Sequence, residues 1–272
     1  MPRKFTKFLI IPAAATLAAC SGGGGGGEKA PVIAGATQAT VVGANPLGLE
    51  ASFDADTQVI TINGRDYDDF SIDTNGRLTA RRAEDIPGES RGDFNDLAIH
   101  GDTSSGSGEV FLVSSTLEEF VSDDEFEPFF VQLTRDGETT VPTSGNVEYT
   151  GAYLGSRFVE STSDDVVFFQ SARIFGDVSL TADFDDTSTI SGVITNRTGG
   201  GENAWQDMTL DLAAIENGGF AGTISGGGRI GESTSDGAYA GLLTGPDGGE
   251  VIGGLSILHE AGDTEAGIFV AE

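Results

Sequence analysis

The feature that most constrains this chain is a period-two alternation of apolar and polar side chains. In residues 176–184, Val, Leu, Ala and Phe alternate with Asp, Ser and Thr. Such alternation places the apolar side chains on one face of a strand. Turn residues at 185–187 and a returning segment at 188–195 then predict a β-hairpin. No segment shows the sustained i, i+3, i+4 apolar pattern of a helix, so we expect an all-β protein.

Segments of the same kind recur through the C-terminal half, divided by Gly, Asn, Asp and Pro clusters. They lie at residues 147–154, 166–169, 208–213, 219–225, 238–244, 250–258 and 266–270. With the hairpin they make eight or nine strands, which is typical of an antiparallel sandwich or barrel. Side chains just fill a barrel of eight strands. The candidates for this interior are Val178, Leu180, Phe184, Ile190, Leu242 and Leu255.

A second region precedes the barrel candidate, from about residue 31 to residue 140. Its expected strands lie at residues 48–53, 58–62, 77–81, 96–100, 109–114 and 129–133. Its loops are richer in acidic residues. Because Gly and Pro residues gather at 135–145, we expect the junction near residue 140 and divide the body into domains 31–140 and 141–272.

The first twenty residues predict export and lipidation. Arg3, Lys4 and Lys7 precede an apolar run that is too short to span a bilayer. Residues 17–20, Leu-Ala-Ala-Cys, resemble the lipobox of bacterial lipoproteins. This resemblance implies that residues 1–20 are a signal peptide and that Cys20 becomes the acylated first residue of the mature chain. The alternative is an ordinary signal peptide that holds a cysteine near its end.

Residues 21–30 predict a flexible tether, because six glycines follow Ser21. Its reach is roughly 15–20 Å. A serine directly after the lipidated cysteine suits sorting to the outer membrane. Cys20 is the only cysteine of the chain, so no thiol is left for a disulfide, a metal ion or a nucleophile.

The charge of the chain is strongly acidic. It has 43 acidic and 14 basic residues, and loss of the signal peptide leaves 11 basic residues and a net charge of −32. This charge excludes nucleic acid as a partner and disfavours close contact with an anionic membrane surface. It would steer a basic protein toward the molecule, although plain solubility is the more ordinary explanation of such a charge.

Several segments of the C-terminal half share a further pattern. They are GNVEYTG at 145–151 with Tyr153, GDVSLTADF at 176–184 with ISG at 190–192, GAYAGLLTGP at 237–246 and GEVIGG at 249–254. In order and spacing they resemble the β-barrel domain of the transferrin-binding protein B and factor H-binding protein group of surface lipoproteins.

The resemblance implies an N-terminal handle-like antiparallel β domain followed by an eight-stranded antiparallel β-barrel. It also implies a palmitate-bearing lipoprotein that is displayed on the outer membrane at the cell surface and binds a protein, with nutrient or iron acquisition as the wider role. No partner-binding residue carries over from the family motifs, and the Tyr and Gly residues of the matched segments are architectural.

Other signals are weaker. Residues 226–231 fit G-x-G-x-x-G, but a loop rather than a helix follows, so we interpret these glycines as a long flexible hairpin end. His100 and His259, the only histidines, fall at expected strand ends, where exposed histidines are ordinary. No nucleophile-elbow pattern accompanies them, so we predict no catalytic residue and no enzyme. Trp205 is either an exposed loop anchor for a partner or is tucked against the barrel wall.

Metal binding is not expected either. The acidic residues at 123–127 could attract calcium, as could Asp54 with Asp56. Neither group has the spacing or the glycine of an EF-hand, so solvated acidic loops explain them better. We expect no cofactor.

Three alternatives compete with protein binding. A transmembrane β-barrel also uses strands with one apolar face, but the lipid anchor, a C-terminus without an aromatic residue and strands mostly shorter than about 9–11 residues count against it. A lipocalin-like carrier of a small molecule would need an apolar cavity. A non-catalytic structural or adhesion lipoprotein of the envelope is the third.

Overall fold

The computed structural model describes residues 32–33, 37–42, 51–62, 64–67, 70–83, 97–114, 129–163, 166–185, 187–200, 205–230, 236–259 and 263–272. Every regular element in these ranges is a strand, so the expectation of an all-β chain is confirmed. The expected signal peptide, Cys20 and the tether lie outside the described residues, as does the acidic stretch at 123–127. A search of the described residues finds no helix long and apolar enough to cross a membrane.

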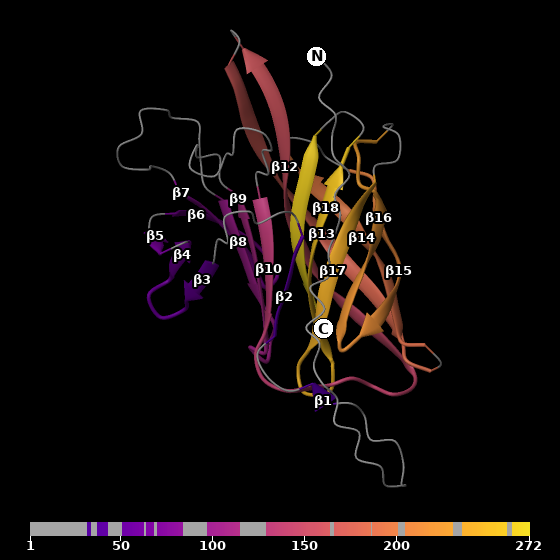
Figure 1. Cartoon of the computed structure of the whole chain (residues 1–272). Coiled ribbons are helices and arrows are strands. Elements are labelled where there is room, and N and C mark those ends of the chain that lie inside the picture. Colours follow the sequence, from indigo (N-terminus) through magenta and orange to yellow (C-terminus); the bar gives the residue numbers. More distant parts are fainter. Residues whose placement is uncertain are drawn as a thin grey trace, which may run out of the picture.

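Eight antiparallel strands of the C-terminal half close into a barrel (Figure 1). Each strand pairs with the next along the chain, and the last returns to the first from Gly151↔Ala271 to Phe158↔Thr264. Closure pairs the backbone of every barrel strand on both sides and confirms the expected eight-stranded barrel. The strands are β12 (Asn146–Ser163), β13 (Val166–Asp183), β14 (Thr189–Gly199), β15 (Met208–Glu216), β16 (Gly219–Gly226), β17 (Asp236–Thr244), β18 (Glu250–Leu258) and β19 (Thr264–Ala271).

The first two barrel strands are longer than expected, with 18 residues each. They form a hairpin that projects beyond the neighbouring strands (Figure 1). The separate strands expected at 166–169 and 176–184 are therefore wrong, because both belong to β13. Polar residues at 170, 171 and 173 break the apolar alternation there, yet Gln170 and Arg173 remain paired with β12.

The N-terminal half forms a six-stranded sheet in the order β2-β10-β9-β8-β7-β6, with two smaller sheets, β3-β4-β5 and β1-β11. We call the six-stranded sheet the handle sheet. The strands are β1 (Val32–Ile33), β2 (Thr37–Val42), β3 (Ala51–Asp54), β4 (Val59–Ile62), β5 (Arg65–Tyr67), β6 (Phe70–Asn75), β7 (Leu78–Ala83), β8 (Leu97–Asp102), β9 (Gly108–Ser114), β10 (Phe129–Arg135) and β11 (Thr139–Thr140).

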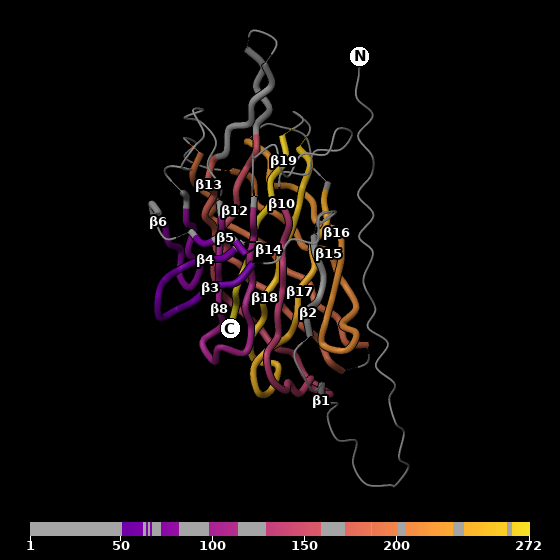
Figure 2. Tube along the Cα trace, turned by 60° about the vertical axis from the view of Figure 1, so that its left-hand side comes forward, coloured from indigo at the N-terminus to yellow at the C-terminus, as the bar shows by residue number. Residues whose placement is uncertain are grey.

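The handle sheet packs against one wall of the barrel, formed by β12, β17, β18 and β19 (Figure 2). A single apolar cluster spans the contact and includes Leu78, Ile99, Leu112, Val131, Leu154, Ile252 and Ile268. Close approach requires glycine in β18, because a Cβ on Gly254 would lie 2.5 Å from the side chain of Val131. Strands β18 and β19 are therefore buried on both faces along almost their whole length, and burial of this shared surface joins the two halves into one body.

The barrel interior is filled by a second apolar cluster. Five of the six expected interior side chains belong to it: Val178, Leu180, Phe184, Ile190 and Leu255. The sixth expectation is wrong, because Leu242 packs in the cluster shared with the handle sheet while its neighbour Leu243 faces the interior. A strand that is apolar on both faces carries no alternation from which the inward face can be read.

The opposite wall of the barrel, β13 to β16, faces solvent. Its outward side chains include the exposed acids Asp177, Asp183, Asp211 and Glu216. Strands that face lipid carry an outward apolar band instead. The described part of this wall therefore fits water better than lipid, although β12 and β13 exceed the length that the sequence suggested.

Candidate partner-binding rim

The connections β14–β15, β16–β17 and β18–β19 open at one end of the barrel, since alternate connections of an antiparallel barrel share an end. The β12–β13 hairpin extends from the same end (Figure 1). The described loop residues at this end include Trp205, Arg229 and Ile230. We call these three residues the rim.

Trp205 joins two of the loops. Its backbone N–H donates to Arg197 O at 3.1 Å, its indole Nε1–H donates to Gly199 O at 3.1 Å, and it forms a β-bridge with Arg229. The guanidinium carbons of Arg157 and Arg229 lie 4.7 and 5.8 Å from the centroid of its ring. Trp205 is only 5% exposed, so it is tucked in rather than presented as an anchor.

The apolar residue that the rim presents to solvent is Ile230, which is 72% exposed, and the neighbouring Arg229 is exposed as well. It follows Arg229, whose carbonyl accepts a hydrogen bond from the Gln206 side chain at 2.9 Å. An apolar side chain on a fixed backbone resembles the anchors that dominate protein interfaces. The sequence drew attention only to the glycines of this loop, and a lone isoleucine between Arg and Gly gave no signal of its exposure.

The glycines at the start of this loop form a turn that is fixed by hydrogen bonding and close packing. Gly226 and Gly227 have φ values of 89° and 82°, a region that favours glycine. Gly227 donates its N–H to Asp207 O at 3.1 Å, and a Cβ on it would lie 2.7 Å from the Met208 side chain. These contacts give residues 226–230 a defined turn, and the rest of the expected flexible hairpin end lies outside the described residues.

Beneath the rim lies a cluster of buried charges, which we define as Tyr153, Arg197, His259 and Glu265. Arg197 Nη2 donates to both carboxylate oxygens of Glu265 at 2.5 and 2.7 Å, and the Tyr153 hydroxyl donates to one of them at 2.7 Å. His259 Nε2 lies 3.3 Å from the other oxygen. The side chains of Arg197, His259 and Glu265 are 0% exposed. The expectation of an exposed His259 is therefore wrong.

The electrostatics of this buried charge cluster favour a charged carboxylate. Burial alone would raise the pKa of Glu265, but Arg197 and His259 outweigh it and hold the pKa at about 2. Burial and the neighbouring Glu265 charge raise the pKa of the Tyr153 hydroxyl, which keeps it protonated as a donor. Arg197 also donates to the carbonyls of Gln206 and Gly227 at 2.6 and 2.7 Å. The cluster thus ties two rim loops to the barrel interior.

A further buried ion pair supports the rim from β12. Arg157 donates to Asp263 Oδ2 through Nε at 3.0 Å and through Nη2 at 2.8 Å. Asp263 belongs to the β18–β19 connection, whose end is also held by the His259 N–H donating to Asp263 O at 2.8 Å. Arg157 therefore links the β18–β19 loop to the Trp205 ring, so the β14–β15, β16–β17 and β18–β19 loops share one set of contacts.

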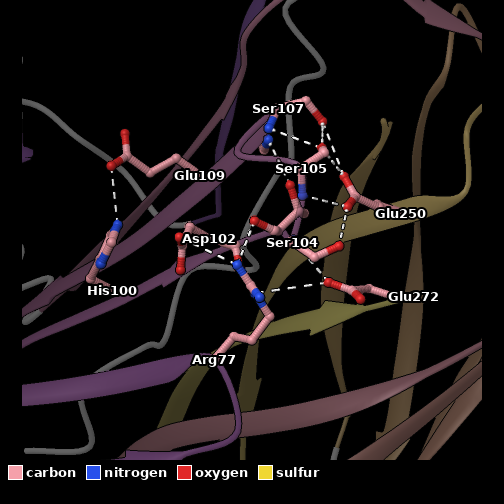
Figure 3. Close-up of polar contacts among 11 residues, drawn as sticks. Arg77, His100, Asp102, Ser104, Ser105, Ser107, Glu109, Glu250 and Glu272 are labelled. Carbon is pink, nitrogen blue, oxygen red and sulfur yellow. Dashed lines mark hydrogen bonds and ion pairs between the residues drawn. The ribbon is translucent and has the colours of Figure 1, made fainter. Parts of the chain in front are cut away.

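A polar seam at the other end fixes the handle sheet to the barrel (Figure 3). Glu250 of β18 accepts hydrogen bonds from the hydroxyls of Ser104, Ser105 and Ser107 and from the Ser105 N–H at 2.8 Å. These serines form the turn between β8 and β9. Burial alone would raise the pKa of Glu250, but the serine hydrogen bonds lower it. We call these four residues the serine seam.

The serine seam does not assemble a hydrolytic site. Figure 3 shows His100 apart from the serines and directed toward Glu109, with Nε2 and Oε1 3.0 Å apart. His100 is 6% exposed and lies between Phe53 and Phe111, with ring centroids 4.6 Å from each, so the expected exposed position is wrong. A triad needs its base on the nucleophile, whereas these serines donate to a carboxylate.

The described residues contain no cluster of three or more His, Cys, Asp or Glu side chains that could hold a metal ion. Asp54, one of the calcium candidates, instead accepts the backbone N–H groups of Asp56 and Thr57 at 2.9 and 3.1 Å. The Thr57 and Asp56 hydrogen bonds lower the pKa of Asp54. This is the arrangement of an Asx turn, so the acid has a structural role.

No family model matches the chain, and no curated protein matches it. Solved structures do match. A transferrin-binding protein B double mutant from Haemophilus parasuis Hp5 gives a TM-score of 0.48 and 16% identity, over 88% of this chain and 44% of that chain. Intact Ap-TbpB with N and C lobes gives 0.46 and 16%, over 88% and 46%. Isotype 1 TbpB from serogroup B Neisseria meningitidis gives 0.44 and 14%, over 85% and 42%.

This chain spans less than half the length of those three proteins. A structure described as a surface lipoprotein is covered over 98% of its length, with a TM-score of 0.38 and 14% identity. The transferrin-binding structures belong to the group that the barrel motifs of the sequence resemble.

Proposed function

We propose that this chain is an outer-membrane surface lipoprotein that binds a protein partner through its rim. In this proposal residues 1–20 are the signal peptide with lipidated Cys20, residues 21–30 the tether, residues 31–140 the handle domain and residues 141–272 the barrel domain. The observation that carries it is the exposed Ile230 on a loop that Trp205, Arg157 and the buried charge cluster hold in place. A fixed loop binds without the cost of ordering.

The position of β1, the first strand that the structure describes, supports display of the rim away from a membrane. Val32 of β1 pairs with Thr140, and the neighbouring Thr139 hydroxyl donates to Gly245 O at 2.6 Å. Gly245 lies in the β17–β18 turn, at the end of the barrel opposite the rim, where Figures 1 and 2 place β1. A tether that precedes β1 would therefore leave the rim at the far end.

The barrel interior favours binding at the surface over carriage of a small molecule. Tyr149, Tyr153 and Phe269 are fully buried within the interior cluster, together with the aliphatic side chains of the other strands. A carrier barrel keeps this space for its ligand. We infer no enzymatic activity, because His100 and His259 lie against carboxylates and the hydroxyls of the serine seam donate to Glu250 rather than to a histidine.

Anchoring and display are tested on intact cells that carry the full chain or Cys20→Ser. We expect the unmodified protein in the membrane fraction and its loss when the cells are shaved with protease, because the rim would face outward. The Cys20→Ser protein should leave the membrane fraction. Protection of the unmodified protein inside the envelope, or membrane retention of the variant, would contradict the proposal.

The binding site is tested with Ile230→Asp against Ile72→Asp, a matched change at a 56% exposed position on the handle sheet. Affinity for a partner captured by the unmodified protein is measured by surface plasmon resonance. We expect Ile230→Asp to weaken it by about tenfold or more, as loss of an interface anchor does, and Ile72→Asp to change it by less than about twofold. Equal effects of the two changes would refute the rim as the site.

A further inference from the structure

Strand β15 contains a β-bulge. Toward β14 its partners run from Ile190↔Ala213 to Gly192↔Leu210, and toward β16 from Leu210↔Ile224 to Ile215↔Phe220. Between these paired positions β15 contains one residue more than β14 and one residue more than β16. Strict alternation from Met208 and Leu210 would turn Leu212 into the barrel, but the bulge makes Asp211 and Leu212 consecutive exposed residues.

Contacts on both faces hold this bulge. From inside, the buried Tyr239 hydroxyl donates to the backbone carbonyl of Asp211. The Tyr239 ring crosses β16 at Gly222, where a Cβ would lie 2.7 Å from the ring. From outside, the Thr223 hydroxyl donates to the Asp211 carboxylate at 2.6 Å. Bulges with such support re-aim a side chain and are specific features of a fold.

The side chain that is re-aimed is strongly exposed. Leu212 is 70% exposed, and Val193 on the adjacent strand β14 is 38% exposed. Both lie on the barrel wall that the handle sheet leaves uncovered. The same wall carries exposed acids, and the described residues between 174 and 226 include no exposed Lys or Arg, because Arg197 is buried.

We propose that Leu212, Val193 and the surrounding acids of β13 to β16 form a second docking surface, which takes a basic protein segment with an apolar anchor. The apolar side chain of such a segment would pack on Leu212, and its Lys or Arg residues would face Asp211 and Glu216. Charge complementarity selects this partner, since a second copy of the chain would bring the same net charge of −32 and be repelled. The surface lies on the barrel side and is separate from the rim.

The test uses fluorescently labelled peptides and the mature full-length chain. One probe alternates Leu and Lys, and the other alternates Ser and Lys with equal length and charge. Binding is followed by fluorescence anisotropy at several salt concentrations. We expect the Leu–Lys probe to bind at least about fivefold more tightly than the Ser–Lys probe, because only the former has an apolar anchor.

Leu212→Ser should remove this preference, while Ile230→Ser on the rim and Ile72→Ser on the handle sheet should keep it. Tyr239→Phe retains the ring but releases the Asp211 carbonyl, so it should weaken the preference through the bulge. Equal binding of the two probes to the unmodified chain, or an unchanged preference in Leu212→Ser, overturns the proposal. Loss of the preference in Ile230→Ser alone would place the apolar contact on the rim and also overturn it.

Discussion

Replacing Glu265 by Gln tests whether the buried charge cluster stabilises the barrel. The carboxylate is fully buried and is the only described acceptor that Arg197, Tyr153 and His259 share. The amide keeps the size of the side chain but leaves the Arg197 charge without its counter-charge. Removing one partner of a buried ion pair costs about 3–5 kcal/mol of unfolding free energy, and we expect a loss in this range at neutral pH.

The pKa of Glu265 gives a second route to the magnitude and predicts its pH dependence. A folded pKa of about 2 against an ordinary value of 4.5 corresponds to about 3 kcal/mol of stability. Because the folded pKa is the lower one, this contribution is fully present above pH 4.5 and is lost as the pH falls through about 2. The difference between the unmodified protein and Glu265→Gln should therefore shrink steadily below pH 4.5.

Urea unfolding followed by tryptophan fluorescence measures both effects, since Trp205 is the only tryptophan and its backbone N–H donates to the carbonyl of Arg197, a member of the cluster. Glu148→Gln, an exposed change on β12, is the matched control. A double-mutant cycle with Arg197→Gln should give a coupling free energy of about 2 kcal/mol. A loss below about 1 kcal/mol, or a difference that is the same at pH 3 and pH 7, would refute the reasoning.

Two further changes probe packing and the serine seam. Gly253→Ala should lower the unfolding free energy by about 1–3 kcal/mol, because its Cβ would lie 2.1 Å from the Phe269 ring. Gly249→Ala is the control, since its Cβ would meet no heavy atom within 4 Å, and it should leave the melting temperature unchanged in the same thermal melts. Glu250→Gln should loosen the handle sheet and speed its proteolysis relative to Glu148→Gln. Because the pKa of Glu250 is lowered, the stability that its carboxylate contributes is present at neutral pH and fades in acid. Equal proteolysis of the two variants at pH 7 would contradict this role.

The alternation of apolar and polar side chains predicted those strands that have one face in solvent. The hairpin expected at 176–184 and 188–195 is the β13–β14 pair, with Ala182↔Ile190 and Val178↔Ile194 in register. The same signal fails where the handle sheet covers the barrel, because β17 to β19 are apolar on both faces. Which of Leu242 and Leu243 points inward depends on a contact with distant strands, and local sequence does not encode it.

The candidate sites were harder to predict than the fold. Leu212 stands at an inward position of a regular strand, and only a bulge supported by Tyr239 from another strand turns it outward. Histidines at strand ends suggested exposure, but His259 is enclosed by residues brought together by barrel closure. Each case depends on partners far apart in the chain, with separations of 28 residues for Tyr239 and Asp211 and 68 for Arg197 and Glu265.

A buried charge cluster beneath the rim is a costly way to stabilise a barrel, since apolar side chains of similar volume often stabilise as well or better. What apolar side chains cannot do is donate to the carbonyls of Gln206 and Gly227, which Arg197 holds. The cluster therefore makes sense as a device that orders the loops. If so, Glu265→Gln should weaken partner binding without touching the partner, whereas Ile230→Asp should weaken it at unchanged stability. A Glu265→Gln protein that loses stability but binds the partner normally would show that the cluster does not support binding at the rim.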